Sequence, residues 1–333
     1  MNNKILTITV PAYNVEEYIQ ECLDSFIIEE LISNIEVIVV DDGSKDKTAQ
    51  IVSRYVERYP GFFILHSKEN GGHGSTINAG LRLAKGKYFK VVDGDDWVNR
   101  KDIIQLVNFL RGSDSDLILT NYYWVDHSTK KVRRKQSPAW NTTSFENEYD
   151  FKDISKELFL RMHAITVKTS IYQDNKIRID EKKFYVDQEY VLFITPFINT
   201  VTLLNLDVYM YRLGLDGQSM NIRSLQKNVD QHYSVLNRLL YFYSELESKK
   251  IESFRLDFLA RSIAAMAGSQ IKIYLSFPME KAHREDIIRF ELMLKQNYPK
   301  IYRNVKHPVI RVLRSTKYYL YPLGVLGVKI RGF

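Results

Sequence analysis

Residues 86–97 read Gly-Lys-Tyr-Phe-Lys-Val-Val-Asp-Gly-Asp-Asp-Trp, and this stretch decides the expected fold. A mostly apolar run predicts a buried strand at residues 88–92, and three carboxylates follow within four positions, those of Asp93, Asp95 and Asp96. Carboxylates this close raise one another's pKa unless a cation lies between them. Because ligands bind at the carboxyl ends of strands in open α/β sheets, the stretch predicts a site for Mg²⁺ or Mn²⁺. An acidic turn that caps the next helix is the alternative.

Strands and helices alternate on both sides of this stretch. Apolar runs predict strands at residues 5–10, 35–40, 62–65, 88–92 and 117–120, and helical spacing of apolar residues predicts helices at 48–59, 75–84 and 103–110. An earlier helix, which buries Cys22, is expected to be capped by Asn14 and Glu17. This alternation predicts an α/β fold with a doubly wound, mostly parallel sheet.

Polar residues follow each of the first three strands. These segments are Pro11-Ala12-Tyr13-Asn14, Asp41-Asp42-Gly43-Ser44 and Asn70-Gly71-Gly72-His73-Gly74-Ser75. The glycine segment lacks the patterns of a P-loop and of a dinucleotide-binding loop, but its backbone N–H groups can bind an anion at the start of the next helix. Taken singly, Asp42 reads as a turn residue and His73 as a solvated loop residue. Their meeting at one sheet edge favours a nucleotide diphosphate site.

Length and composition narrow the class of protein. The 333 residues suggest two domains. The single cysteine, Cys22, excludes an intrachain disulfide and is expected to be a core thiol. We expect no signal peptide at residues 5–10, and no stretch approaches the ~20 apolar residues of a membrane span. The expected localisation is therefore cytoplasmic.

The net charge of +7 belongs to the C-terminal tail. After Glu291 the chain has no acidic residue and nine basic ones, namely Lys295, Lys300, Arg303, Lys306, Arg311, Arg314, Lys317, Lys329 and Arg331. The tail is expected to hold the protein on the anionic inner face of the cell membrane, with a solubilising charge run or an oligomer contact as alternatives. A nucleic-acid partner is not expected, because the charge is confined to the tail and no aromatic RNA-binding motif is present.

The second half of the chain changes character twice. Residues 126–150 are polar and basic, which predicts an exposed hairpin. Residues 158–164 read as a helical stretch with His163 packed inside it, an acceptor contact being the less favoured alternative. From Leu225 apolar residues recur at steps of three and four, which predicts helices throughout residues 223–333.

Four of these segments together resemble a known family. Pro11 to Asn14, Val39 to Ser44, Asn70 to Gly80 and Gly86 to Asp96 look like the successive motifs of family 2 glycosyltransferases of the GT-A fold. Later segments, residues 184–190 and 209–220, are similar to the family more weakly. The resemblance implies a GT-A domain at residues 1–222, with a nucleotide-binding half at 1–115 and an acceptor-side half at 116–222, and a helical region at 223–333.

The resemblance also implies roles for single residues. Pro11 and Asp42 would hold the uracil of a UDP-sugar donor, Asp93 would contact the ribose, Asp95 would ligate Mn²⁺ or Mg²⁺, and Asp187 would be the catalytic base. The remaining residues expected around the nucleotide sugar are Tyr13, Asn14, Gly72, His73, Asn78 and Gly94.

Two positions depart from the family pattern. The family often has an arginine where this chain has Ile77, so His73 or Arg212 is expected to contact the diphosphate instead. Val186 stands where the family usually has glutamate, which leaves Asp187 as the expected base with Glu189 in reserve.

The expected function is therefore an inverting, metal-dependent hexosyl or N-acetylhexosaminyl transfer from a UDP-sugar to an acceptor hydroxyl. The acceptor would be a glycan, a lipid-linked sugar or a glycoprotein in cell-surface polysaccharide synthesis, and a homo-oligomer is left open. A noncatalytic UDP-sugar binding protein is the alternative. A sugar nucleotidyltransferase would need a glycine-rich, basic loop after the first strand, which residues 11–14 do not provide.

Overall fold

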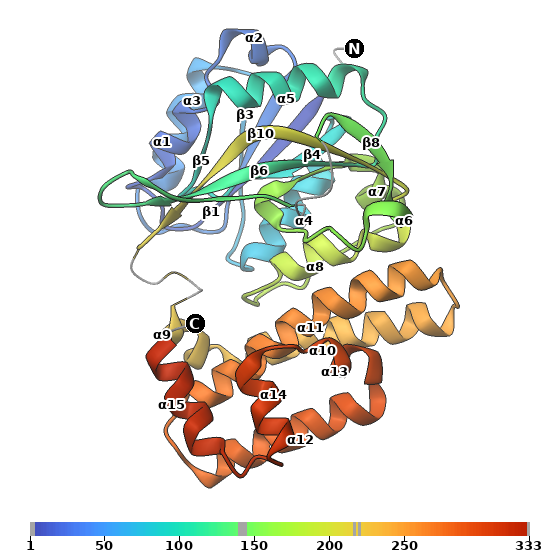
Figure 1. Ribbon diagram of the computed structural model, residues 1–333. Helices are drawn as coiled ribbons and strands as arrows, with labels where there is room; N and C mark the ends of the chain where they lie inside the picture. Colours follow the sequence, from blue (N-terminus) through green and yellow to red (C-terminus); the bar gives the residue numbers. More distant parts are fainter. Residues whose placement is uncertain (1–3, 139–144, 216–217, 219–220, 332–333) are drawn as a thin grey trace. The chain divides into compact units, whose positions relative to one another are not determined.

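A computed structural model of the chain describes residues 4–138, 145–215, 218 and 221–331. The chain divides into two compact units, Met1–Leu215 and Asp216–Phe333 (Figure 1). The first unit ends just after strand β10 (Thr200–Leu213), before the boundary expected after residue 222. Residues 216–217 and 219–220 of the loop expected at 209–220 lie outside the described residues.

The first unit is built on one large sheet. Its other strands are β1 (Leu6–Ala12), β2 (Ile35–Asp41), β3 (Phe63–Ser67), β4 (Tyr88–Val91), β5 (Trp97–Val98), β6 (Leu117–Asp126), β7 (Val132–Gln136), β8 (Asn147–Asp150) and β9 (Ile165–Lys168). The strand order is β3-β2-β1-β4-β9-β6-β10-β5, with β7 beside β6 and β8 beside β10. The run from β3 to β4 is parallel, as is the pair of β6 and β10, while β5, β7, β8 and β9 pair in antiparallel fashion. The expected α/β fold with a mostly parallel sheet is confirmed.

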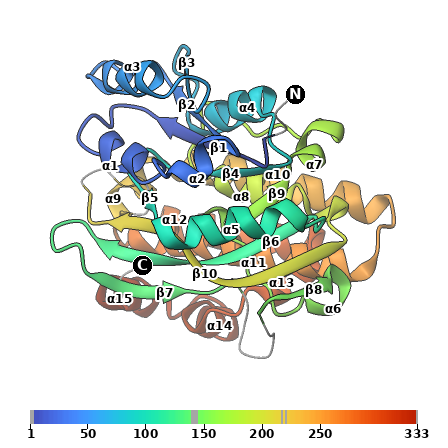
Figure 2. The ribbon, with the colours of Figure 1, turned by 90° about the horizontal axis from the view of Figure 1, so that it is seen from above.

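Helices cover both faces of this sheet. They are α1 (Ile19–Asp24), α2 (Glu29–Ile32), α3 (Thr48–Arg58), α4 (His73–Leu83), α5 (Arg100–Gly112), α6 (Phe151–Ile154), α7 (Thr169–Asp174) and α8 (Asp187–Leu192), with 3₁₀ turns at Met162–Ala164 and Thr195–Phe197. Alternate residues of β1 and β2 pack with α1, α3 and α5 in the main core. On the opposite face Ala79 of α4 packs against Ile38 and Val40 of β2. Figure 2 views the sheet from the side of α1, α3 and α5, and it shows α5 lying across β6 and β10.

The register of the parallel strands brings their carboxyl ends together. Ala12 pairs with Asp41, and the backbone N–H of Asp42 donates to the oxygen of Ala12 over 2.8 Å. On the other side of β1, Gly94 N–H donates to the oxygen of Pro11 over 3.0 Å. The segments after β1, β2 and β4 therefore meet at one edge of the sheet.

Two local predictions are wrong. Helix α1 begins at Ile19 with no side-chain cap, because Asn14 adopts a φ of 52° and its Oδ1 accepts from the N–H of Lys45 over 2.8 Å. Residues 158–164 hold only a short 3₁₀ turn, since Ile165 already belongs to β9. In both places a contact with a distant segment overrides the local pattern. The prediction of a buried free thiol at Cys22 is confirmed. Of the exposed hairpin expected at residues 126–150, β7 is exposed and pairs with β6, and residues 139–144 lie outside the described residues.

The second unit is helical, as expected. Its helices are α9 (Ile222–Lys227), α10 (Val229–Ser248), α11 (Ser253–Ser276), α12 (Lys281–Asn297), α13 (Pro299–Asn304), α14 (Pro308–Ser315) and α15 (Tyr321–Arg331). The predicted apolar stripe of α10 is buried at Leu236, Leu239 and Tyr243. Within the described part of the chain, no helix combines the length and the apolar character needed to cross a membrane.

Candidate active site

The acidic loop between β4 and β5 is anchored through Asp96. This side chain is fully buried, and its Oδ2 accepts from the Tyr209 hydroxyl over 2.6 Å while its Oδ1 accepts from the backbone N–H of Arg212 over 2.7 Å. Both donors lie on β10, more than a hundred residues away along the chain. Burial and the charges of Asp95 and Asp93 raise the pKa of Asp96 well above its usual value. Asp96 therefore fixes the position of the loop.

The side chain of Arg212 supports the same loop. Its Nε donates to the backbone oxygen of Asp95 over 2.6 Å, and its terminal nitrogen lies 2.7 Å from Glu21 Oε2. The guanidinium also lies 4.6 Å above the ring of Trp97, within cation–π distance. The sequence pointed to Arg212 as a diphosphate ligand; in the structure it is buried and supports the acidic loop.

The other two carboxylates of the loop, Asp93 and Asp95, differ in their partners. Asp93 Oδ1 lies 2.9 Å from His73 Nε2. Burial by itself would raise the pKa of Asp93, but His73 brings it below the ordinary value. Asp95 is half-buried and takes part in no ion pair with any described residue, and burial together with the charge of Asp93 raises its pKa to about 6. A bound cation would stabilise the ionised form of such a carboxylate.

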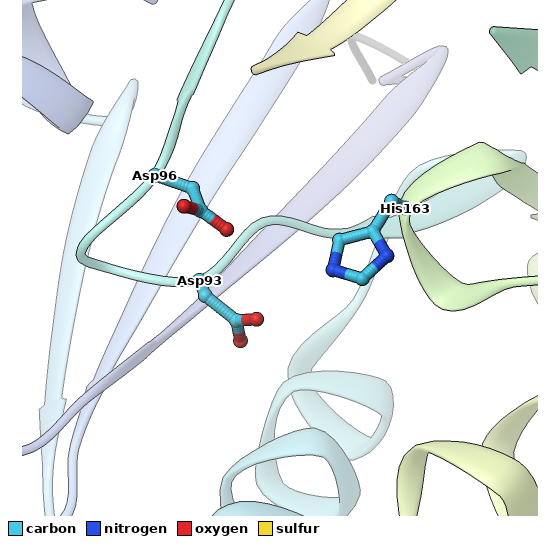
Figure 3. A group of neighbouring side chains, drawn as sticks. All are labelled: Asp93, Asp96 and His163. Atoms are coloured by element: carbon cyan, nitrogen blue, oxygen red, sulfur yellow. The ribbon is translucent and has the colours of Figure 1, made fainter. Parts of the chain in front are cut away.

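His163 completes the cluster from another part of the chain. Ligand atoms of Asp93, Asp96 and His163 lie within 4.8 Å of one another, and Figure 3 shows the imidazole beside the two carboxylates. The ring stacks on Tyr122, with centroids 5.1 Å apart, and lies 4.5 Å from the ring of Tyr211. Its Nδ1 is buried without a hydrogen-bond partner among the described residues, and burial lowers its pKa to about 4. His163 is thus both packed, as expected, and available as a neutral nitrogen ligand.

The glycine loop closes over Asp42. This carboxylate accepts from the backbone N–H of Gly71 over 2.9 Å and of Gly72 over 2.7 Å, and Lys68 Nζ lies 2.5 Å from its Oδ1. Gly72 has a φ of 79°, and a Cβ there would lie 3.2 Å from the backbone of Lys182, so the loop needs glycine at this position. The residue expected to bind uracil therefore also holds the loop that begins α4.

The same loop and α4 position the segment that leads to Asp187. The Asn78 side chain donates to the oxygen of Ile179 over 2.8 Å and accepts from its N–H over 2.9 Å. A little further on, Glu189 is fully buried and its Oε2 accepts from the backbone N–H of Asp180 over 2.7 Å. Asn78 and Glu189 thus act as clamps on residues 179–180.

Asp187 lies half-buried at the first position of α8. Burial raises its pKa, the charges of Arg161 and His73 oppose that rise, and the charge of Asp93 adds to it. Charges on three other segments thus reach this carboxylate. The expected base therefore lies in the same electrostatic environment as the acidic loop.

The residues expected at the end of β1 differ in exposure and in hydrogen bonding. Pro11 is buried, and a Cβ on Gly94 would lie 2.9 Å from its oxygen, which explains the glycine in the acidic loop. Tyr13 is exposed and free to contact a ligand. Asn14 is tied to the loop after β2 through the Ser44 hydroxyl, 3.0 Å from its N–H.

A comparison with protein-family models decides the family. The model described as Glycosyl transferase family 2 matches residues 7–176, which is half of the chain. The chain belongs to glycosyl transferase family 2. The transferase thus carries the family's motifs on the strand ends and glycine loop described above.

Known proteins similar to the transferase include two bacterial glycosyltransferases. Glycosyltransferase GlyG of Streptococcus pneumoniae is 28% identical over 235 residues, covering 63% of this chain and 71% of GlyG. Poly(ribitol-phosphate) beta-glucosyltransferase of Bacillus spizizenii is 27% identical over 220 residues, covering 65% of this chain but only 33% of that protein. The crystal structure of S. aureus TarS 1–349 in complex with UDP-GlcNAc superimposes with a TM-score of 0.70 at 20% identity, covering 99% of this chain and 93% of that one. The last likeness shows that the fold is shared.

The sequence did not predict a role for several residues around the site of the transferase. Lys68 bonds Asp42, and Tyr209 bonds Asp96. Lys90 is fully buried and donates to the backbone oxygen of His163 over 2.9 Å. A lysine inside the apolar run of β4 was the one signal visible in the sequence, because a buried lysine needs a specific partner.

Proposed function

We propose that the chain transfers a sugar from a UDP-sugar to an acceptor hydroxyl with inversion, in a metal-dependent reaction that builds a cell-surface glycan. Membership of the family supports glycosyl transfer itself. The complex of TarS 1–349 with UDP-GlcNAc supports a UDP-sugar donor. The poly(ribitol-phosphate) on which the Bacillus spizizenii relative acts supports a cell-surface polymer as acceptor. Family membership also favours an enzyme over the noncatalytic alternative.

The nucleotide is proposed to lie over the ends of β1, β2 and β4. Asp42 Oδ2 accepts only from the N–H of Gly72 among the described residues, and a carboxylate oxygen has about two acceptor positions, so this oxygen can also accept from the uracil ring. Asp93 is proposed to contact the ribose, with His73 beside it to bind the diphosphate. Pro11 and the exposed Tyr13 would enclose the base.

A divalent metal fits the oxygen-rich cluster at this edge. Asp95 is the proposed ligand, because its half-buried carboxylate has no ion-pair partner in the described chain, whereas both oxygens of Asp96 already accept hydrogen bonds. Asp93 and His163, whose ligand atoms lie within 4.8 Å of each other, are proposed to assist. When bound, Mn²⁺ or Mg²⁺ would neutralise the charge of the leaving diphosphate.

Asp187 is the proposed general base. Inversion requires the acceptor oxygen to attack the anomeric carbon opposite the leaving UDP, and that oxygen must lose its proton as the bond forms. The observation that carries the proposal is the half-buried carboxylate of Asp187 at the start of α8, on a segment that Asn78 and Glu189 hold in place and that is separate from the nucleotide motifs. Burial raises its pKa and so makes it a stronger base. Glu189, the reserve, is occupied by the N–H of Asp180.

Single-turnover transfer by Asp187→Asn tests the proposal. The substitution preserves the shape of the side chain and removes the base, so transfer should slow by roughly 10² to 10⁴ while UDP and Mn²⁺ affinities stay near those of the parent. Asp174→Asn, on the exposed end of α7, is the matched control and should transfer at the parent rate. Donors are screened as a panel of UDP-sugars, with UDP release measured with and without lipid-linked acceptors.

Three outcomes would contradict parts of this assignment. If Asp187→Asn transfers at the parent rate while a folded Glu189→Gln does not, the base is Glu189. If the parent binds UDP but transfers from no donor in the panel, the noncatalytic alternative holds. Transfer that is unchanged when chelators remove divalent ions would refute the role of the metal.

A further inference from the structure

Helix α15 of the second unit is apolar on two opposite faces. Its inner face buries Tyr321, Val325 and Val328. Leu323 and Leu326 on its outer face are exposed, and together with Tyr319 and Leu320, which lie just before the helix, they form what we call the apolar ridge. Residues 318–328 contain no charged side chain. A surface helix of a water-exposed domain normally places polar residues on its outer face, so the ridge calls for a partner.

The ridge is exposed although the helix behind it is well packed. A Cβ added to Gly324 would lie 3.1 Å from the side chain of Leu313 on α14, so the two helices are in close contact there. Tyr319 is nevertheless 79% exposed, Leu323 59% and Leu326 52%. The exposure therefore belongs to a fixed surface.

Exposed basic residues lie in the same stretch of chain as this ridge. Two of the nine basic residues of the tail are used inside the unit, since Arg314 forms an ion pair with the buried Glu291 and Lys300 pairs with Asp257. Lys306, Arg311 and Lys317 are exposed instead and take part in no ion pair with the described residues. Lys317 lies two residues before the start of the ridge, and Arg311 lies on α14, the helix that packs against α15.

We propose that α14 and α15 dock the protein on an anionic membrane surface. The ridge would enter the boundary between headgroups and acyl chains, and Lys306, Arg311 and Lys317 would meet lipid phosphates. An apolar face bordered by lysine and arginine is the pattern of helices that lie in the plane of a membrane interface. A second copy of the chain fits less well, because a symmetric contact would bring the same positive charges against themselves.

Membrane binding was expected of the whole tail at residues 292–333, and we assign it to residues 306–326. Three basic residues near an anionic leaflet favour binding by roughly 10²-fold. Removing two leucines from the interface should weaken binding by at least another tenfold or so. Both contributions are needed, so binding should require anionic lipid and weaken as salt is added.

Vesicle cosedimentation of the full chain tests the proposal. The vesicles are phosphatidylcholine alone or phosphatidylcholine mixed with phosphatidylglycerol. The parent should pellet only with the mixed vesicles, and the double variant Leu323→Ser/Leu326→Ser should bind about tenfold more weakly or worse. Leu292→Ser is the matched control, because Leu292 is a leucine of similar exposure on α12, 49%, and it should bind like the parent.

A second set of variants isolates the charge. The triple variant Lys306→Gln/Arg311→Gln/Lys317→Gln should lose roughly 10²-fold in affinity for the mixed vesicles. Lys249→Gln/Lys250→Gln, at the exposed end of α10, should not. UDP affinity measured on each variant shows that the first unit is intact, and it separates a failure here from a failure of the proposed transfer.

Three results would overturn the proposal. Equal binding to vesicles with and without phosphatidylglycerol would remove the role of charge. Parent-like binding by the leucine variant would remove the role of the ridge. A parent that ignores vesicles but forms a dimer dissolved by Leu323→Ser/Leu326→Ser would show that the ridge is an interface between two copies.

Discussion

Replacing Asp42 by alanine tests how the glycine loop is held. The side chain is 3% exposed, and it accepts hydrogen bonds from Gly71, Gly72 and Lys68, with the Ser75 hydroxyl 3.3 Å from its Oδ1. The loop has few other ties to the end of β2, one being the bond from the Asn70 amide to the backbone oxygen of residue 42 over 3.0 Å. Loss of the carboxylate should therefore loosen the loop as well as weaken nucleotide binding.

The magnitude follows from the contacts that would be lost. The Gly71 N–H is buried and would be left without its acceptor, which costs ~1 to 3 kcal/mol. Lys68 would lose its carboxylate but keep the oxygens of Glu69 and Ser75, and its side chain reaches solvent, so this loss is smaller than that of a fully buried pair. We expect Asp42→Ala to lower the free energy of unfolding by about 3 to 5 kcal/mol and UDP affinity by about 5 to 150-fold.

Urea unfolding and UDP calorimetry measure the two effects separately. Asp41→Ala is the matched control, because the Asp41 side chain is almost as buried but, among the described residues, accepts only from the Ser44 N–H. Its loss should cost about 1 kcal/mol. In a Lys68→Met background the cost of Asp42→Ala should shrink, since the shared contact is already absent. Equal destabilisation by Asp42→Ala and Asp41→Ala would show that the Asp42 carboxylate does not hold the glycine loop.

Two further variants test the acidic loop and its strand. Asp95→Ala should reduce Mn²⁺ affinity in the presence of UDP by at least about tenfold and leave urea unfolding nearly unchanged, and an unaltered Mn²⁺ titration would reassign the ligand. Burial lowers the pKa of Lys90 from 10.5 to about 7, so between these values the unfolded chain binds more protons than the folded one. The parent should therefore gain up to ~1.4 kcal/mol of stability per pH unit from about pH 7 to pH 10 relative to Lys90→Met. The exposed Lys101→Met should run parallel to the parent over this range, and a parallel curve for Lys90→Met would count against a titrating lysine.

The sequence determined most of the strands and helices of the first 120 residues and their order. Strand β2 is an unbroken apolar run at residues 35–40 apart from Glu36, which only a strand covered on both faces explains, and α3 and α5 follow from apolar spacing. The carboxylates of the acidic loop could be located in the same way, because a run of acids directly after a buried strand lies at the ligand-binding edge of such a sheet. These features are local, so chain spacing is enough to find them.

Only the tertiary structure decided what each polar side chain contacts. Asp96 is held by donors on β10, His163 reaches the acidic loop from the turn before β9, and the Asn78 clamp joins α4 to residues a hundred positions later. The spacing of residues in a sequence carries no distance between segments so far apart. The apolar ridge could not be predicted for a related reason. Helical spacing shows that α15 has two apolar faces, but only its packing against α11 and α14 decides which of them stays exposed.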